Sequence, residues 1–273
     1  MPSNREILQK KRDSPPMIKV PDQEYLYFAY GMKRGGHHAV LNWVLGHYDS
    51  WLYCNNCLQL DGQIQVQYDS DIRNKGEKPY EMKLLSFEDR PNFSESSFES
   101  ICKSYKPKKN ILILRDVYNT FASRFQKKRF PHEFAKKQQC LDEKNWIEKW
   151  INFNDVSIWK KYALEFVGET NFMGDAIKIK YNSWFSNKQY RIELSKNFSH
   201  NFTDVGLEDV LDFGLGSSFD QLKFHKKAQQ MNVISRWKEF YKDEEYINCV
   251  TSDKEIEKLN KEIFNLSIPK IYL

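Results

Sequence analysis

The sequence predicts an α/β fold, a three-layer sandwich with a central parallel sheet. Three observations predict it. Residues 25–30 are aromatic and apolar, and a glycine-containing turn separates them from apolar residues at helical spacing over 39–45. Residues 111–114 form a short apolar block typical of a central parallel strand. Residues 176–181 alternate in polarity as a strand does. A chain of 273 residues with 40% hydrophobic residues can bury one large core around such a sheet.

The remaining chain can be divided coarsely. Residues 1–22 contain several prolines and predict an extended lead-in, which leaves residues 23–273 as a single domain. Residues 61–80 form a polar connection. Aromatic residues between 146 and 166 recur near helical spacing, which favours the core face of one or two helices over an aromatic binding site. Further along, Ser252 with Glu255 three residues later predicts a capping box at the start of a C-terminal helix.

The turn after the first strand predicts an anion-binding site. Its sequence is Gly31-Met32-Lys33-Arg34-Gly35-Gly36-His37-His38-Ala39. Gly35 and Gly36 can adopt positive φ and let the backbone approach a ligand closely. The free N–H groups and the positive dipole end of the next helix would face that ligand. We therefore expect phosphate or sulfate at this turn.

The same turn differs from a Walker P-loop. Gly31 and Gly36 have the P-loop separation, but His37–His38 stand where that motif has Lys and Ser or Thr. The lysine that reaches the terminal phosphates and the hydroxyl that ligates magnesium are both missing, which disfavours an ordinary kinase or ATPase. The cations, Lys33–Arg34, precede the glycine pair instead.

A second segment predicts another anion site close by. Arg115 follows the apolar block at 111–114, and Asp116 is a suitable N-cap for the helix that comes next. Ligands of open α/β sheets bind outside the carboxyl ends of the strands. We therefore expect Arg115 to share a crevice with the Gly35–Gly36 turn.

These two segments resemble the sulfotransferases that use 3′-phosphoadenosine 5′-phosphosulfate (PAPS) as donor. The stretch from Gly31 to Leu41 is similar to the glycine turn of heparan sulfate sulfotransferases, which binds the 5′-phosphosulfate. In the same family an arginine at a strand end and a serine eight residues later hold the 3′-phosphate, and Arg115 and Ser123 have that spacing. The resemblance implies a P-loop NTPase-like sulfotransferase fold.

The resemblance also implies roles for individual residues. Arg34 would be the catalytic cation, assisted by Lys33, and a basic loop before Trp237 would close over the nucleotide. Fixed cations can stabilise the charge that develops as a sulfuryl group leaves. The donor-binding residues implied in this way are Lys33, Arg34, Gly35, Gly36, His37, His38, Ala39, Arg115, Ser123, Lys226, Lys227 and Arg236.

An acceptor hydroxyl or amine needs a general base as well. Residues 81–89 predict a strand that ends in acids, which would put Glu88 at the carboxyl edge of the sheet near the donor. Glu88 is therefore our candidate base. Asp89, His132 and His225 remain open as alternatives.

Composition limits the partners and the setting. The net charge is +5, with 42 basic and 37 acidic residues, which does not imply nucleic acid or another polyanion as partner. No signal peptide or membrane span is visible, and five scattered cysteines suit a reducing compartment, so we expect a cytoplasmic protein. The pair Cys54 and Cys57 lacks the further ligands of a zinc site, and we expect no metal.

The sequence thus predicts an enzyme that moves the sulfuryl group of PAPS to a hydroxyl or amine of a small-molecule acceptor and releases adenosine 3′,5′-bisphosphate (PAP). A natural product is a reasonable acceptor. Two alternatives remain, namely a nucleotide or small-molecule kinase with a degenerate P-loop and a non-catalytic PAPS-binding module. The acceptor's identity and the oligomeric state are left open.

Overall fold

The computed structural model describes residues 25–60, 63–66, 71–89, 95–129, 156–198, 201–212 and 216–267. The expected lead-in at 1–22, the candidate base His132 and the aromatic residues at 146 and 150 lie outside this part of the chain.

A six-stranded sheet forms the centre of the fold, with the strand order β5-β2-β6-β1-β7-β8. Neighbouring strands run parallel from β2 to β8, whereas β5 is antiparallel to β2. The α/β class is confirmed, but the sheet is mixed and not purely parallel. The strands are β1 (Leu26–Gly31), β2 (Trp51–Cys54), β5 (Ile72–Lys75), β6 (Met82–Glu88), β7 (Lys109–Leu114) and β8 (Ile177–Lys180).

The region 61–80, expected to be a polar connection, contributes strands. β3 (Leu58–Leu60) and β4 (Gln63–Gln65) form a separate antiparallel pair, and β5 adds an edge to the main sheet. Ile64 and Val66 are both buried, so two apolar side chains between glutamines anchor this pair to the core. The polar connection expected at 61–80 therefore contains β4 and β5.

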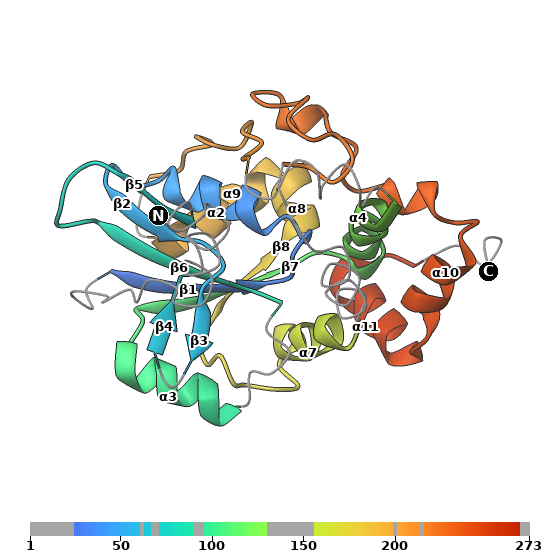
Figure 1. Ribbon diagram of the computed structural model, residues 1–273, viewed down its shortest axis with the longest axis horizontal. Coiled ribbons are helices and arrows are strands. Elements are labelled where there is room, and N and C mark those ends of the chain that lie inside the picture. Colours follow the sequence, from blue (N-terminus) through green and yellow to red (C-terminus); the bar gives the residue numbers. More distant parts are fainter. Residues whose placement is uncertain are drawn as a thin grey trace, which may run out of the picture.

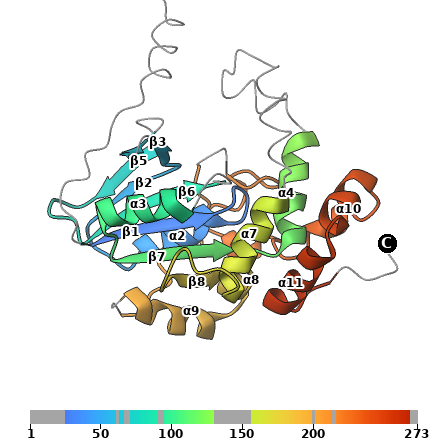
Figure 2. The ribbon, with the colours of Figure 1, turned by 90° about the horizontal axis from the view of Figure 1, so that it is seen from below.

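Helices cover both faces of the sheet. In Figure 1, α2, α8 and α9 lie on one face and α3 and α7 on the other, and Figure 2 shows α4, α10 and α11 gathered beyond one end of the strands. The helices are α2 (His37–Leu45), α3 (Glu95–Tyr105), α4 (Val117–Arg129), α7 (Val156–Val167), α8 (Tyr181–Ser186), α9 (Lys188–Ser195), α10 (Glu244–Thr251) and α11 (Lys254–Phe264), with short 3-10 turns at η3 (Lys196–Phe198), η5 (Ala228–Gln230) and η6 (Arg236–Glu239).

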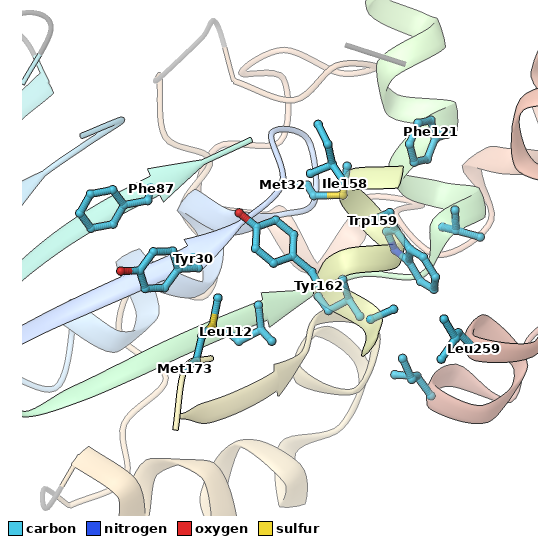
Figure 3. Packing of buried hydrophobic residues seen from close by; sticks show 14 of the residues in the cluster. Tyr30, Met32, Phe87, Leu112, Phe121, Ile158, Trp159, Tyr162, Met173 and Leu259 are labelled. Atoms are coloured by element: carbon cyan, nitrogen blue, oxygen red, sulfur yellow. The ribbon is translucent and has the colours of Figure 1, made fainter. Parts of the chain in front are cut away.

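The side chains of β1 divide between the two cores because successive strand residues point to opposite faces. Phe28 and Tyr30 pack into the cluster that includes α7, while Tyr27 and Ala29 pack against α2. Every residue of β1 is buried, as expected for a central strand. Figure 3 shows Trp159 and Tyr162 of α7 in the first cluster, which confirms their expected place in the core.

The capping box predicted at Ser252 is not formed. α11 begins at Lys254, and its N-cap is Asp253, whose Oδ1 accepts a hydrogen bond from the N–H of Glu255 at 2.8 Å. Ser252 still belongs to the end of α10, and its hydroxyl donates to the carbonyl of Cys249 at 3.0 Å. The acidic neighbour takes the capping position because the serine hydroxyl is already used.

Three further observations concern membranes, metals and thiols. Within the described ranges, none of the helices is long and apolar enough to cross a membrane. His, Cys, Asp and Glu side chains of the same ranges form no group of three that could hold a metal ion. Cys54 and Cys57 are buried and form no disulfide, and the thiol of Cys57 donates to the carbonyl of Cys54 at 3.3 Å. Burial raises the pKa of the Cys54 thiol to about 12, which keeps that thiol protonated and unreactive at neutral pH.

Candidate functional site

The ends of three parallel strands meet at the glycine turn. Gly31, the last residue of β1, is in register with Glu88 at the end of β6 and with Ile113 of β7. Arg115 follows β7 directly. This arrangement brings the turn, the acidic end of β6 and Arg115 to the same edge of the sheet, as the sequence predicts.

The turn has a backbone conformation that requires glycine. Within the turn, the N–H of Gly35 donates to the carbonyl of Met32 at 2.9 Å. Gly36 has φ 79°, and a Cβ at this position would lie 2.0 Å from the ring of Tyr181. Arg34 has φ 70°, which is unusual for a residue with a side chain and is found at functional sites. The turn is thus held in a strained, closed shape against α8.

The start of α2 has the backbone N–H groups that an anion cradle requires. The first intrahelical bonds are donated by Ala39 and Val40, both to the carbonyl of Gly36, at 3.1 and 3.2 Å. The N–H groups of His37 and His38 precede these bonds, at the end of the helix where the dipole is positive. Backbone donors and a positive dipole end favour an anion in this position.

Arg115 joins the turn to the helix that follows β7. Its Nη1 donates to the carbonyl of Arg34 at 3.1 Å and to the hydroxyl of Ser123 at 3.2 Å, and its Nη2 donates to the carbonyl of Val233. The guanidinium lies 5.1 Å from the ring centre of Tyr181 and is 3% exposed. Its buried Nε has no hydrogen-bond partner among the described residues, which leaves a donor for a ligand.

The N-cap predicted after Arg115 is confirmed. The carboxylate of Asp116 accepts a hydrogen bond from the N–H of Asn119 at 2.8 Å, and it also binds the side-chain amide of Asn182 at 2.8 Å. The carbonyl of Arg115 accepts from the indole of Trp159 at 2.8 Å. The strand end that carries Arg115 is therefore fixed on both sides by buried hydrogen bonds.

Two further arginines are Arg34, within the turn, and Arg236, whose charge couples to that of Arg34. Arg34 donates to the carbonyl of Gly216 at 3.0 Å, while Arg236 donates to the hydroxyl of Ser217 at 2.9 Å and to the carboxylate of Asp220 at 2.7 Å. Burial lowers the pKa of Arg34 to about 10, against the opposing charge of Glu88, and the positive charges of Arg124 and Arg236 act in the same direction as burial. Burial and the charge of Arg115 likewise lower the pKa of Arg236 to about 10. Both remain cations at neutral pH.

Lys226 and Lys227 are exposed at the surface. Lys226 forms an ion pair with Asp209 at 2.7 Å, and its side chain is 69% exposed. Of the basic residues expected in the closing loop, Arg236 is the one whose charge couples to Arg34 and Arg115. Trp237, next to it, is buried in the core.

Glu88 lies beside the turn with His38. Its Oε2 is 3.6 Å from the Nε2 of His38, and the carboxylate is almost completely buried. Burial would raise the pKa of Glu88, but electrostatic interactions with His38, His37, Lys33 and Arg34 outweigh burial and lower that pKa overall. Glu88 is therefore ionised and counters the charge of the arginines.

Asp89, an alternative base, is engaged in holding the turn. Its Oδ1 accepts from the N–H of Lys33 at 3.1 Å and forms an ion pair with the fully buried guanidinium of Arg124. Arg124 also donates to the carbonyl of Lys33 at 3.2 Å. His225, another alternative, is exposed, and its Nδ1 contacts the carbonyl of Val210 at 3.1 Å.

Sequence reasoning missed Arg124 and the polar residues behind the histidines. The ring of His37 is buried, with Nε2 at 2.8 Å from the hydroxyl of Ser86. Burial lowers the pKa of His37 to about 4, so its ring is neutral and only its backbone belongs to the cradle. The ring of His38 lies 2.9 Å from Asn55 Oδ1. Arg124 follows Ser123 directly on α4. This neighbourhood is the sequence signal that could have placed Arg124 near the site.

The fold is an α/β fold with a mixed six-stranded sheet, and three arginines lie around the glycine turn at the end of β1. Comparisons of the chain with protein-family models, with curated proteins and with solved structures found no match.

Proposed function

We propose that this chain is a sulfotransferase of P-loop NTPase-like fold, which transfers the sulfuryl group of PAPS to a hydroxyl or amine of a small-molecule acceptor and releases PAP. One observation carries the proposal. Nη1 of Arg115 contacts both the carbonyl of Arg34 and the hydroxyl of Ser123, at 3.1 and 3.2 Å. Three residues assigned to the donor by resemblance, from positions far apart in sequence, thus share one hydrogen-bond network.

The donor carries anions at two places, and the site offers two sets of donors. The N–H groups at the start of α2, with Arg34, suit the 5′-phosphosulfate. Arg115 and Ser123 suit the 3′-phosphate because a guanidinium can bind two phosphate oxygens at once and a hydroxyl can add a third bond. A nucleotide without a 3′-phosphate would leave the buried Nε of Arg115 without a hydrogen-bond partner, which favours PAPS over ATP.

Arg34 is the residue proposed to lower the barrier. Sulfuryl transfer from a phosphosulfate is expected to resemble phosphoryl transfer, in which negative charge moves to the bridging oxygen. A fixed cation beside that oxygen stabilises the charge without reorganisation, and removal of such a group costs about 10²–10³ in rate. The bond from Arg34 to Gly216 holds the guanidinium over the turn.

The first test is calorimetric titration with PAP in the absence of metal, compared with ATP and magnesium. Binding of PAP with weak binding of ATP supports the proposal, because it requires a 3′-phosphate site. Preference for ATP with magnesium would favour a kinase with a degenerate P-loop and overturn the proposal.

The second test separates an enzyme from a PAPS-binding module. PAP release from PAPS is measured with a panel of simple phenols and amines, for the wild type and for Arg34→Ala. We expect the variant to lose about 10²–10³ in rate while PAP affinity changes little. Arg73→Ala is the matched control, since that arginine is in an exposed ion pair with Asp212. Tight PAP binding without any release from PAPS would identify a non-catalytic module.

A further inference from the structure

Asn119 on α4 is bonded to the backbone on both sides of Arg236. Its Nδ2 donates to the carbonyl of Ile234 at 3.0 Å, and its Oδ1 accepts from the N–H of Trp237 at 3.3 Å. The side chain of Asn119 is completely buried. The stretch of chain that carries Arg236 is therefore attached to α4 through one buried amide.

The orientation of this amide is fixed by Asp116. Asn119 Nδ2 lies 3.0 Å from both carboxylate oxygens of Asp116, and the backbone N–H of Asn119 donates to the same carboxylate at 2.8 Å. Because carboxylate oxygens accept hydrogen bonds, the NH2 group of the amide must face Asp116 and Ile234, which leaves its oxygen for Trp237. A buried amide that is bonded at both ends is a rigid connection between two segments.

Arg115 bonds the same stretch of chain, which we call the segment 233–237. Nη2 of Arg115 donates to the carbonyl of Val233, the first residue of this segment. Three hydrogen bonds therefore attach the segment 233–237 to the start of α4, one from Arg115 and two from Asn119. They bring Arg236 close enough to Arg115 for the two charges to interact.

The two arginines repel each other. Burial and the charge of Arg115 both lower the pKa of Arg236. The three acceptors of Arg115 are neutral oxygens, whereas Arg236 has the carboxylate of Asp220 at 2.7 Å. A phosphate bound by both guanidinium groups would relieve the repulsion. Before the phosphate binds, the hydrogen bonds of Asn119 oppose the separation of the two cations.

We propose that Asn119 is a positioning residue for recognition of the 3′-phosphate, and that it acts by holding Arg236 beside Arg115. Asn119 contacts no atom of the nucleotide in this role, and the two arginines bind the phosphate. This inference rests on the function proposed above and deepens it. It names the residue through which the donor site distinguishes a nucleotide with a 3′-phosphate from one without.

The test compares the binding of PAP with that of adenosine 5′-monophosphate (AMP), which lacks the 3′-phosphate. We expect Asn119→Ala to raise the dissociation constant of PAP by about 10-fold, because two hydrogen bonds that position Arg236 are lost. The dissociation constant of AMP should change by less than about twofold. A merely structural role of Asn119 would lower the folded fraction and weaken both nucleotides by the same factor, which would overturn the inference.

Asn42→Ala is the matched control. Asn42 on α2 also donates from its side-chain amide to a distant backbone carbonyl, that of Gly206 at 3.1 Å. This variant should keep the wild-type preference for PAP over AMP. An equal loss of preference in Asn42→Ala and Asn119→Ala would mean that any loosening of the fold has this effect, and the inference would fail.

A double-mutant cycle tests whether Asn119 acts through Arg236. Arg236→Met removes the charge and keeps an unbranched apolar side chain beside Phe219, whose ring centre lies 4.7 Å from the guanidinium. We expect this variant to lose preference for PAP by itself. In its background Asn119→Ala should change PAP affinity by less than about twofold, because there is no arginine left to position. Full additivity of the two effects overturns the inference.

Asn119→Ser provides the answer if Asn119→Ala does not fold. Its hydroxyl can still donate to Asp116 but does not replace the bonds to Ile234 and Trp237, so the same loss of preference is expected. If neither variant folds, Arg236→Met still tests the inference, because an unchanged preference for PAP in that variant overturns it.

The wild type separates this inference from the proposed function. A wild type that binds PAP no better than AMP overturns both, since it has no site for the 3′-phosphate. A wild type that prefers PAP, with the same preference in Asn119→Ala, overturns the inference alone.

Discussion

The guanidinium of Arg115 donates a hydrogen bond to the backbone carbonyl of Arg34 at 3.1 Å, across 81 residues of sequence. The two residues follow neighbouring parallel strands, β7 and β1. Arg34 has a positive φ of 70°. Through the contact with its carbonyl, the arginine at the end of β7 is joined directly to the glycine turn.

Replacement of Arg115 should therefore weaken donor binding more than a loss of charge alone would. Arg115→Lys keeps the charge but cannot reach Arg34, Ser123 and Val233 together. A charge-assisted hydrogen bond contributes about 1.5–3 kcal/mol, so we expect the dissociation constant for PAP to rise by about 10- to 100-fold. Titration calorimetry measures it.

Two variants control this prediction. Ser123→Ala removes one neutral hydroxyl and should weaken PAP binding by about fivefold. Arg73→Lys changes an arginine in an exposed ion pair and should bind PAP as the wild type does. Equal PAP affinity in the wild type and Arg115→Lys would remove Arg115 from the donor site.

Gly36 should tolerate no side chain. Its φ is 79°, and an added Cβ would lie 2.0 Å from the ring of Tyr181. Gly168 has a similar φ of 89° with no atom within 4 Å of an added Cβ, so Gly168→Ala isolates the backbone strain, which is about 1–2 kcal/mol. We expect Gly36→Ala to reduce the free energy of unfolding in urea by at least about 2 kcal/mol more than that. Failure of Gly36→Ala to fold, with Gly168→Ala folded, agrees with the prediction. Equal losses would mean that the turn moves away from Tyr181.

Asp89 should matter for stability through its charge. Its ion pair with Arg124 involves a guanidinium without solvent exposure, whereas the pair between Lys109 and Asp175 is exposed. Asp89→Asn retains an oxygen for the N–H of Lys33 but removes the carboxylate that pairs with the buried guanidinium of Arg124, which costs about 3 kcal/mol or more. Asp175→Asn should cost much less, because solvent screens the exposed pair. Urea unfolding at pH 7 measures both, and similar values for the two variants would contradict a supporting role for the buried pair.

Local patterns could predict the centre of the fold. β1, the turn and α2 were visible because an apolar strand, glycines and a helical repeat follow one another within about twenty residues. Arg115 could be predicted because a polar residue follows a purely apolar block. The sequence did not predict β5, because the residues of Ile72–Lys75 are half-buried or exposed and the strand is held by backbone pairing with β2.

Contacts between distant segments set the rest of the site. Nothing in the sequence near Asp89 indicates that Arg124 pairs with it, because the fold alone brings the end of β6 to α4. The same holds for His38 and Asn55, which come from α2 and the residue after β2. The capping position at Asp253 was missed for a different reason, namely that two adjacent residues could cap, and the hydroxyl of Ser252 bonds to the carbonyl of Cys249 instead.

The buried ring of His37 makes stability depend on pH in a defined window. Burial lowers its pKa from 6.5 to about 4, so the folded state binds fewer protons at this group than the unfolded state. The stabilisation is complete above about pH 6.5 and is lost as the pH falls. The loss reaches about 3 kcal/mol at pH 4.

Asparagine at this position offers Ser86 an amide in place of the ring and cannot titrate. We therefore expect the difference in unfolding free energy between the wild type and His37→Asn to shrink or reverse by about 3 kcal/mol between pH 7 and pH 4. Urea unfolding at several pH values measures it, with His225→Asn as the exposed control. A difference that stays constant with pH would mean that the ring is protonated inside the fold, with the lone pair of Nδ1 taking up a proton beside Gly31.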